Sequence, residues 1–241
     1  MRTPALSAKY IPPLILTGSL LAIYLFSMAL GLTWANDGSD GGDLITAAAR
    51  GGVAHPTGYP LYLLMARAFQ LIPVGSLAFR TNLMSAVAAA LASVLVYVLV
   101  TRYLSASNEH LSWLPGLVSA YAFGLSPLIW SQAVITEVYT LHALFVVLIL
   151  YLSSDQTALK LARKKLDLVL GLTFGLAIGN HVTTILLLPI LFFSMISRRS
   201  TLPGEVQPAG KWQLDKSSTL RRLTGLGVGS LVYLTLPLRA L

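Results

Sequence analysis

Long segments without any charged residue constrain this chain more than any other feature. No Asp, Glu, Lys or Arg lies within residues 10–36, 81–101 or 168–197. A membrane-spanning helix needs about 20 apolar residues. An Arg or Lys at its centre costs roughly 2.5–3.5 kcal/mol on insertion scales. Each of these segments is therefore a candidate for one or two membrane crossings.

The composition excludes an ordinary soluble enzyme. Charged residues make up 11% of the 241 residues and hydrophobic residues 55%, with a mean hydropathy of +0.73, whereas soluble domains carry roughly 25% charged residues. The chain has no Cys, which excludes disulfides, thiolate metal sites and cysteine nucleophiles. The net charge of +8 does not indicate nucleic-acid binding, because the excess Lys and Arg residues flank the predicted crossings and signal their orientation.

We expect an all-α, polytopic membrane protein with about seven transmembrane helices and a cytoplasmic N-terminus. Basic residues at 160–165 and 198–199 flank the longest charge-free segment, and the positive-inside rule places both flanks in the cytoplasm. That segment must then cross twice. The same argument makes residues 34–81 the first extracytoplasmic loop and residues 198–222 a cytoplasmic basic loop. The predicted spans are 11–33, 82–101, 112–129, 138–153, 167–179, 183–197 and 223–238.

The first predicted outer loop opens with three acidic residues, Asp37, Asp40 and Asp43. Asp43 precedes a stretch of helical character, residues 44–50, and we expect it to cap that helix. Two chemical functions suit these carboxylates: a general base with a supporting acid, or a divalent cation site with oxygen ligands. A solvated Asp/Gly turn at a helix start explains the same pattern without any chemistry.

Other polar groups lie at the remaining outer ends of the predicted spans. Residues 55–62 carry two prolines and a glycine around a histidine and two tyrosines, which by themselves favour a structural turn with interfacial tyrosines. Glu137 begins a span, and His142 follows five residues later. A functional carboxylate and a carboxylate stabilised by the helix dipole explain the position of Glu137 equally well. Asn180 and His181 occupy the third outer tip.

A series of short strings then matches one pattern in order along the chain. In these strings the chain resembles the protein O-mannosyltransferase-like membrane family of the GT-C glycosyltransferases, whose bacterial members are mostly known as a domain of unknown function. The resemblance covers residues 34–241, and because family members continue further, we expect this chain to be an N-terminal portion. The strings are Asp40-Gly41-Gly42-Asp43, His55-Pro56-Thr57-Gly58-Tyr59-Pro60, Arg80-Thr81-Asn82, Trp130-Ser131-Gln132, Glu137-Val138-Tyr139, Gly179-Asn180-His181 and Leu236-Pro237-Leu238-Arg239.

The resemblance implies transfer of a mannose-like sugar from a polyprenyl-phosphate donor to an acceptor hydroxyl on the extracytoplasmic side, with inversion. It implies Asp40 as the base, with Asp43 beside it, and Arg80, His181 and Arg239 as groups that neutralise the donor phosphate. The partners that it implies for this chain are the lipid-linked sugar and membrane lipids, and no nucleic acid is expected to bind. No cofactor is implied, and a divalent metal stays open. The expected location is a bacterial plasma membrane. The other implied substrate-binding residues are His55, Tyr59, Asn82, Gln132, Glu137 and Asn180.

Two other functions stay open at this point. One is a non-catalytic membrane protein that binds or transports a lipid-linked saccharide. The other is an ion-coupled transporter, which fits less well because transporters bind near the membrane midplane through broken, polar helices. The ionisable residues of this chain gather instead at the ends of the predicted spans.

Overall fold

The charge-free segments fold into helices. The computed structural model is almost entirely helical over the residues it describes, which confirms the all-α class. The exception is one antiparallel pair of two-residue strands, β1 (Ile196–Ser197) and β2 (Gln213–Leu214). The structure describes residues 6–105, 112–154, 163–193, 196–197 and 213–239.

The helices follow one another through short connections. Three short 3₁₀ segments, η1, η2 and η3, interrupt or extend them. The bounds are α1 (Leu6–Ser27), η1 (Ala35–Asp37), α2 (Gly41–Arg50), α3 (Pro60–Gln70), α4 (Leu77–Ser105), α5 (Trp113–Gly124), α6 (Pro127–Ala133), α7 (Tyr139–Ser153), α8 (Arg163–Asn180), η2 (Val182–Leu187), α9 (Leu188–Phe193), α10 (Lys216–Ser230), η3 (Leu231–Leu234) and α11 (Thr235–Arg239).

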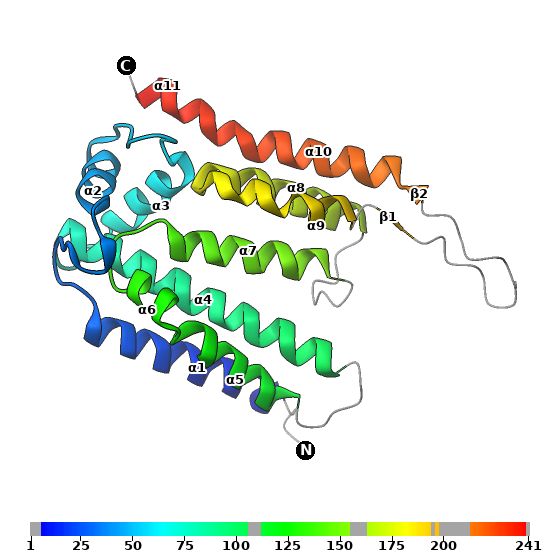
Figure 1. Cartoon of the computed structure of the whole chain (residues 1–241), viewed down its shortest axis with the longest axis horizontal. Coiled ribbons are helices and arrows are strands. Elements are labelled where there is room, and N and C mark those ends of the chain that lie inside the picture. Colours follow the sequence, from blue (N-terminus) through cyan, green and yellow to red (C-terminus); the bar gives the residue numbers. More distant parts are fainter. Residues whose placement is uncertain (1–5, 106–111, 155–162, 194–195, 198–212, 240–241) are drawn as a thin grey trace, which may run out of the picture.

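The long helices lie side by side, and the short helices α2 and α3 cover one end of the bundle (Figure 1). The central helix α4 packs against α1, α5 and α7, and α8 packs against α7 and α10. α1 begins at the end away from α2 and α3, whereas α11 finishes beside them (Figure 1). The end that carries α2 and α3 is therefore formed mainly by the predicted first outer loop.

Two helices, Tyr10–Ser27 and Leu77–Ser105, are each long and apolar enough to cross a membrane. The pair α5 and α6 adds a third candidate if it counts as one span bent by 63°. The helix α7 and the segment Val182–Phe193 are apolar but shorter. By length and composition, the described part of the chain thus holds two helices, or three if the bent pair is one span, that are long and apolar enough to cross a membrane.

Four of the predicted spans differ from the observed helices. The predicted span 183–197 contains η2, α9 and the strand β1, and the predicted span 223–238 runs from α10 through η3 into α11. The predicted span 112–129 is broken at Ser126, which accepts a hydrogen bond from the backbone amide of Ile129 and so starts α6 in a new direction. The first helix ends at Ser27, earlier than predicted, because the next residues bond to neighbours instead. The Ala29 amide donates to the Val134 carbonyl, and Asn82 Nδ2 donates to the Ala29 carbonyl.

The predicted cytoplasmic loop 198–222 is only partly visible. Residues 198–212 lie outside the described residues, and α10 already begins at Lys216. Asp215 caps it by accepting hydrogen bonds from the amides of Ser217 and Ser218. The last part of the basic segment is therefore the first turns of a helix.

Candidate active site

The carboxylates of Asp40 and Asp43 hold the imidazole of His55 between them. Asp40 lies just before α2 and Asp43 in its first turn. After α2 the chain turns back through Gly51, whose φ of +72° is left-handed and suits glycine. Asp43 Oδ2 then accepts hydrogen bonds from the His55 amide at 2.9 Å and from Nδ1 at 2.8 Å, while His55 Nε2 lies 3.4 Å from Asp40 Oδ2.

The prediction that Asp43 caps the following helix is wrong. Asp43 lies inside α2, and no side chain forms a capping hydrogen bond at its start. Burial raises the pKa of Asp43, but the hydrogen bonds from the His55 amide and ring, with the charge of the imidazole, outweigh it and leave the pKa below its ordinary value. Asp43 thus remains ionised and orients the His55 ring toward Asp40.

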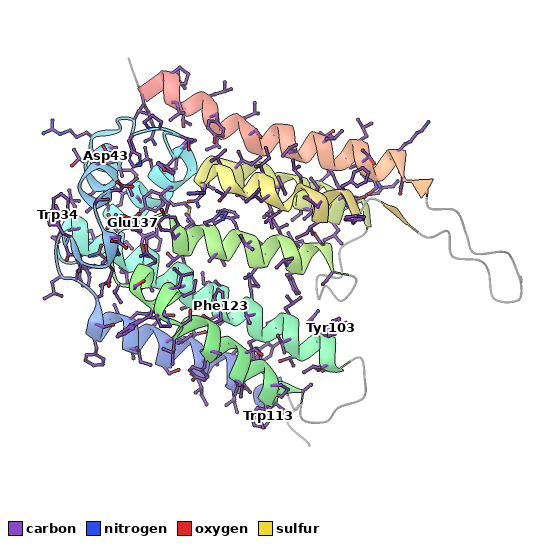
Figure 2. All side chains as sticks on the ribbon, viewed as in Figure 1. Trp34, Asp43, Tyr103, Trp113, Phe123 and Glu137 are labelled. Atoms are coloured by element: carbon purple, nitrogen blue, oxygen red, sulfur yellow. The ribbon has the colours of Figure 1, made fainter. Side chains whose placement is uncertain are left out.

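Glu137 supplies a third carboxyl group at the same end of the bundle (Figure 2). It precedes α7 and its side chain is almost completely buried. Burial, followed by the negative charge of Asp40, raises the pKa of Glu137 to about 7. Its backbone is held by Ser85, whose hydroxyl donates to the Glu137 carbonyl at 3.4 Å. Asn180 Nδ2 donates to the next carbonyl, that of Val138, at 3.3 Å.

A cavity of about 630 Å³ opens between the first loop and helices α5, α6 and α7. Along α7 its lining changes from Tyr139 and His142 to Val146 and Val147, so the cavity has a polar end and an apolar end. The polar end carries Asp37, Ser39, Asp40, Gln132, Glu137, Tyr139 and His142, and the apolar lining is Phe123, Leu128, Ile129, Ala143, Val146 and Val147.

Aromatic and imidazole rings connect the first loop to α7 and to the end of α8. The ring of His181 lies 6.2 Å from that of Tyr59, 5.8 Å from that of Tyr139 and 5.0 Å from that of His142, between centroids. Tyr59 in turn meets the His55 ring edge-on at 5.1 Å. Predicted site residues from two distant segments therefore share one cluster with Tyr139 and His142 of α7.

Each of the three cations expected to bind phosphate has partners elsewhere in the structure. Arg80 donates to the carbonyls of Gln70, Val74 and Gly75, and so stabilises the turn after α3. Arg239 Nη1 lies 3.4 Å from the Gly52 carbonyl. His181 belongs to the ring cluster, and no contact among the described residues joins these three side chains.

Two of the predicted amide side chains, those of Asn82 and Asn180, form hydrogen bonds that hold the fold together. Asn82 is buried and connects two loops, because its Nδ2 donates to the Ala29 carbonyl while its Oδ1 accepts from the Thr136 hydroxyl at 2.5 Å. Asn180 is fully buried beneath the start of α7. Neither lines the cavity, whereas Gln132 does.

The sequence analysis named His142 only in passing, yet it lines the cavity and joins the ring cluster. Its position three residues after Tyr139 puts both on one face of α7, a spacing that could have indicated it. No group of three His, Asp or Glu side chains in the described part of the chain could hold a metal ion. The described residues of the first loop therefore contain no such group of three side chains for the divalent cation site that the sequence suggested.

Comparisons with known proteins agree with this picture. Residues 40–203 match the family "Protein O-mannosyl-transferase TMEM260 N-terminal domain". Protein O-mannosyl-transferase TMEM260 of Mus musculus is 32% identical over 227 residues, which are 91% of this chain and 29% of that protein. The Dictyostelium discoideum protein of the same name is 33% identical over 181 residues, 68% of this chain and 21% of the relative.

The chain thus spans less than a third of the length of these curated relatives. No solved structure matches it significantly. The family match covers more than half of the chain and includes Asp40, Asp43, His55, Gln132, Glu137 and His181. The chain belongs to the N-terminal domain family of the TMEM260 protein O-mannosyl-transferases.

Proposed function

We propose that this chain is part of a membrane glycosyltransferase. It moves a mannose-like sugar from a polyprenyl-phosphate donor to an acceptor hydroxyl on the extracytoplasmic side. The observation that carries this proposal is the Asp43–His55–Asp40 arrangement on a cavity with a polar and an apolar end. A lipid-linked sugar has the same two parts, and the named activity of the relatives is O-mannosyl transfer.

In this mechanism Asp40 accepts the proton of the acceptor hydroxyl as its oxygen attacks the anomeric carbon of the sugar. The bond from that carbon to the phosphate oxygen breaks, and the lipid phosphate leaves with the bonding electrons. Attack opposite the leaving group inverts the anomeric carbon. Asp43 holds the His55 ring beside Asp40, so the charge and position of the base are set before substrate binds.

We also propose a seven-span, GT-C-like arrangement with the α2–α3 end outside and the N-terminus in the cytoplasm. Helices occupy most of the described residues of the predicted spans, although Ile196–Ser197 at the end of span 183–197 form β1 and the first helix ends early. The exposed Trp34 lies at one end of the bundle and Tyr103 and Trp113 lie at the other (Figure 2). Such aromatic residues anchor helices at membrane interfaces. The expected bacterial membrane has no support from the relatives, which are eukaryotic.

The test is a transfer assay with purified full chain in lipid nanodiscs, a radiolabelled polyprenyl-phosphate mannose and a panel of hydroxyl acceptors. Transfer that disappears in Asp40→Asn would support the enzyme. Saturable donor binding without transfer would support the alternative, a protein that binds or moves a lipid-linked saccharide. The engagement of Arg80 by the carbonyls of Gln70, Val74 and Gly75 is the observation that favours this alternative, because transfer needs positive groups on the leaving phosphate.

A further inference from the structure

We propose that the polar end of the cavity binds the saccharide itself, through hydrogen-bond acceptors on His142 and Gln132 that take hydrogens from sugar hydroxyls. This inference rests on the proposed function and names the part of the donor that this cavity recognises. It makes His142 and Gln132 determinants of sugar specificity.

A hydrogen-bond chain defines the tautomer of His142. The Thr183 amide donates to His181 Nδ1, so this ring nitrogen carries no proton. The Thr183 hydroxyl lies 2.6 Å from the same nitrogen and must donate its only hydrogen there. Its oxygen can then only accept from His142 Nε2, which lies 3.2 Å away. Neutral His142 therefore has its proton on Nε2 and an unprotonated Nδ1.

That Nδ1 atom is buried and has no hydrogen-bond partner among the described residues. A buried acceptor without a donor is costly, so a group that binds beside it has to supply a hydrogen. His142 lines the cavity, and the fixed tautomer selects a donor such as a hydroxyl over an acceptor.

Gln132 repeats the pattern from a different helix. Its Nε2 donates to the Asn36 carbonyl at 3.1 Å, which orients the amide because a carbonyl can only accept. This leaves Oε1 as the free end, and it is buried and unpartnered in the described part of the chain. Gln132 also lines the cavity, so a second acceptor there needs a hydrogen from a ligand.

The remaining polar lining points to a polyhydroxyl ligand and away from phosphate. Asp37 and Asp40 add carboxylate acceptors, and no described residue lining this cavity is Lys or Arg. A phosphate would meet repulsion here, whereas several hydroxyls of one sugar ring would each find an acceptor. The phosphate of the donor therefore lies outside the polar end of this cavity.

The experiment measures binding, so it does not depend on turnover. The full chain in nanodiscs with a metal chelator is titrated by calorimetry with polyprenyl-phosphate mannose and with analogues that each lack one sugar hydroxyl. For wild type, at least one analogue should bind roughly tenfold to hundredfold more weakly, as expected when a buried acceptor loses its donor. The ratio of the affinity for the full donor to that for an analogue should fall to about one in His142→Phe for one hydroxyl. It should do so in Gln132→Leu for another hydroxyl.

Matched variants separate hydrogen bonding from loss of structure. His142→Asn keeps an acceptor near the original atom and should preserve most of the discrimination. Ser131→Ala, next to Gln132 but bonded only to the Leu128 carbonyl, should leave every ratio unchanged. Equal ratios in wild type and His142→Phe for every analogue would overturn the inference, as would discrimination that appears only when a divalent metal is added.

Turnover measured on the same samples distinguishes the two proposals. Discrimination without transfer would keep this inference and reject the enzyme. Normal transfer without discrimination would reject the inference and keep the enzyme. Absence of any donor binding would reject both.

Discussion

At the scale of single residues, Asp40 differs from its neighbours because its carboxylate both lines the cavity and touches His55. We expect Asp40→Asn to lower turnover by roughly 10²–10⁴-fold, since general-base assistance is lost. Donor affinity should change little because the base acts on the acceptor. Initial rates at saturating donor measure this, with Asp215→Asn at the other end of the bundle as the control. Retained turnover in Asp40→Asn together with its loss in Glu137→Gln would move the base to Glu137.

The carboxyl of Glu137 predicts how stability changes with pH. Its pKa rises from 4.5 in its ordinary state to about 7 in the folded chain, chiefly through burial. The folded state therefore binds more protons than the unfolded state between these values. The contribution of Glu137 to the free energy of unfolding is on the order of 3 kcal/mol. It is fully present below pH 4.5 and disappears as the pH rises through about 7.

Melting temperatures in detergent between pH 4 and pH 9 check this. The melting temperature of Glu137→Gln, whose side chain at position 137 is always neutral, should fall less steeply than that of wild type as the pH rises. Asp43→Asn serves as the opposite control, because the pKa of Asp43 is lowered and its contribution is lost as the pH falls. Parallel profiles for wild type and Glu137→Gln would contradict the assignment.

At the scale of elements, α8 and α10 pack closely enough for backbone to meet backbone. Glycines on both helices make this possible, because a Cβ at any of them would collide with the opposite backbone. At the end of the pair away from α2 and α3, Asp167 is fully buried and binds Arg221 at 2.8 Å and Arg222 at 2.9 Å. The glycines are Gly171, Gly175, Gly225 and Gly229.

Asp167→Asn should destabilise this helix pair by about 3–5 kcal/mol, because it removes the fully buried carboxylate that both arginines bind. Chemical unfolding in detergent measures the effect. Arg221→Ala should cost less, since the Arg221 side chain is 22% exposed against 5% for Arg222. A wild-type unfolding midpoint for Asp167→Asn would show that packing at the glycines alone holds α8 and α10 together.

At the scale of the whole molecule, the proposed topology predicts that the two ends of the bundle lie on opposite sides of a membrane. Because the chain has no Cys, single cysteines report sidedness without background. Ser39→Cys, in the first loop, should react with an impermeant thiol reagent in sealed vesicles that expose the outer face. Ser154→Cys, after α7, should react only once the membrane is permeabilised. Labelling of both in sealed vesicles would break the proposed topology.

The sequence by itself determined the helical class and the acidic loop. Charge-free segments must hide their backbone in helices if they meet lipid, whatever they pack against. Its short strings, through the family resemblance, also named Asp40, His55 and Glu137 as site residues, whereas the pattern of polar groups at helix ends by itself left structural explanations open.

Only the tertiary structure decided what each of these polar groups does. Asp43 was expected to cap α2 and instead binds His55, since the loop after α2 folds back within hydrogen-bonding distance. Arg80 and Asn82 stabilise loops, whereas His142 joins the cavity and the ring cluster. A hydrogen bond depends on distances between segments far apart in the chain, and local sequence pattern carries no information about those distances.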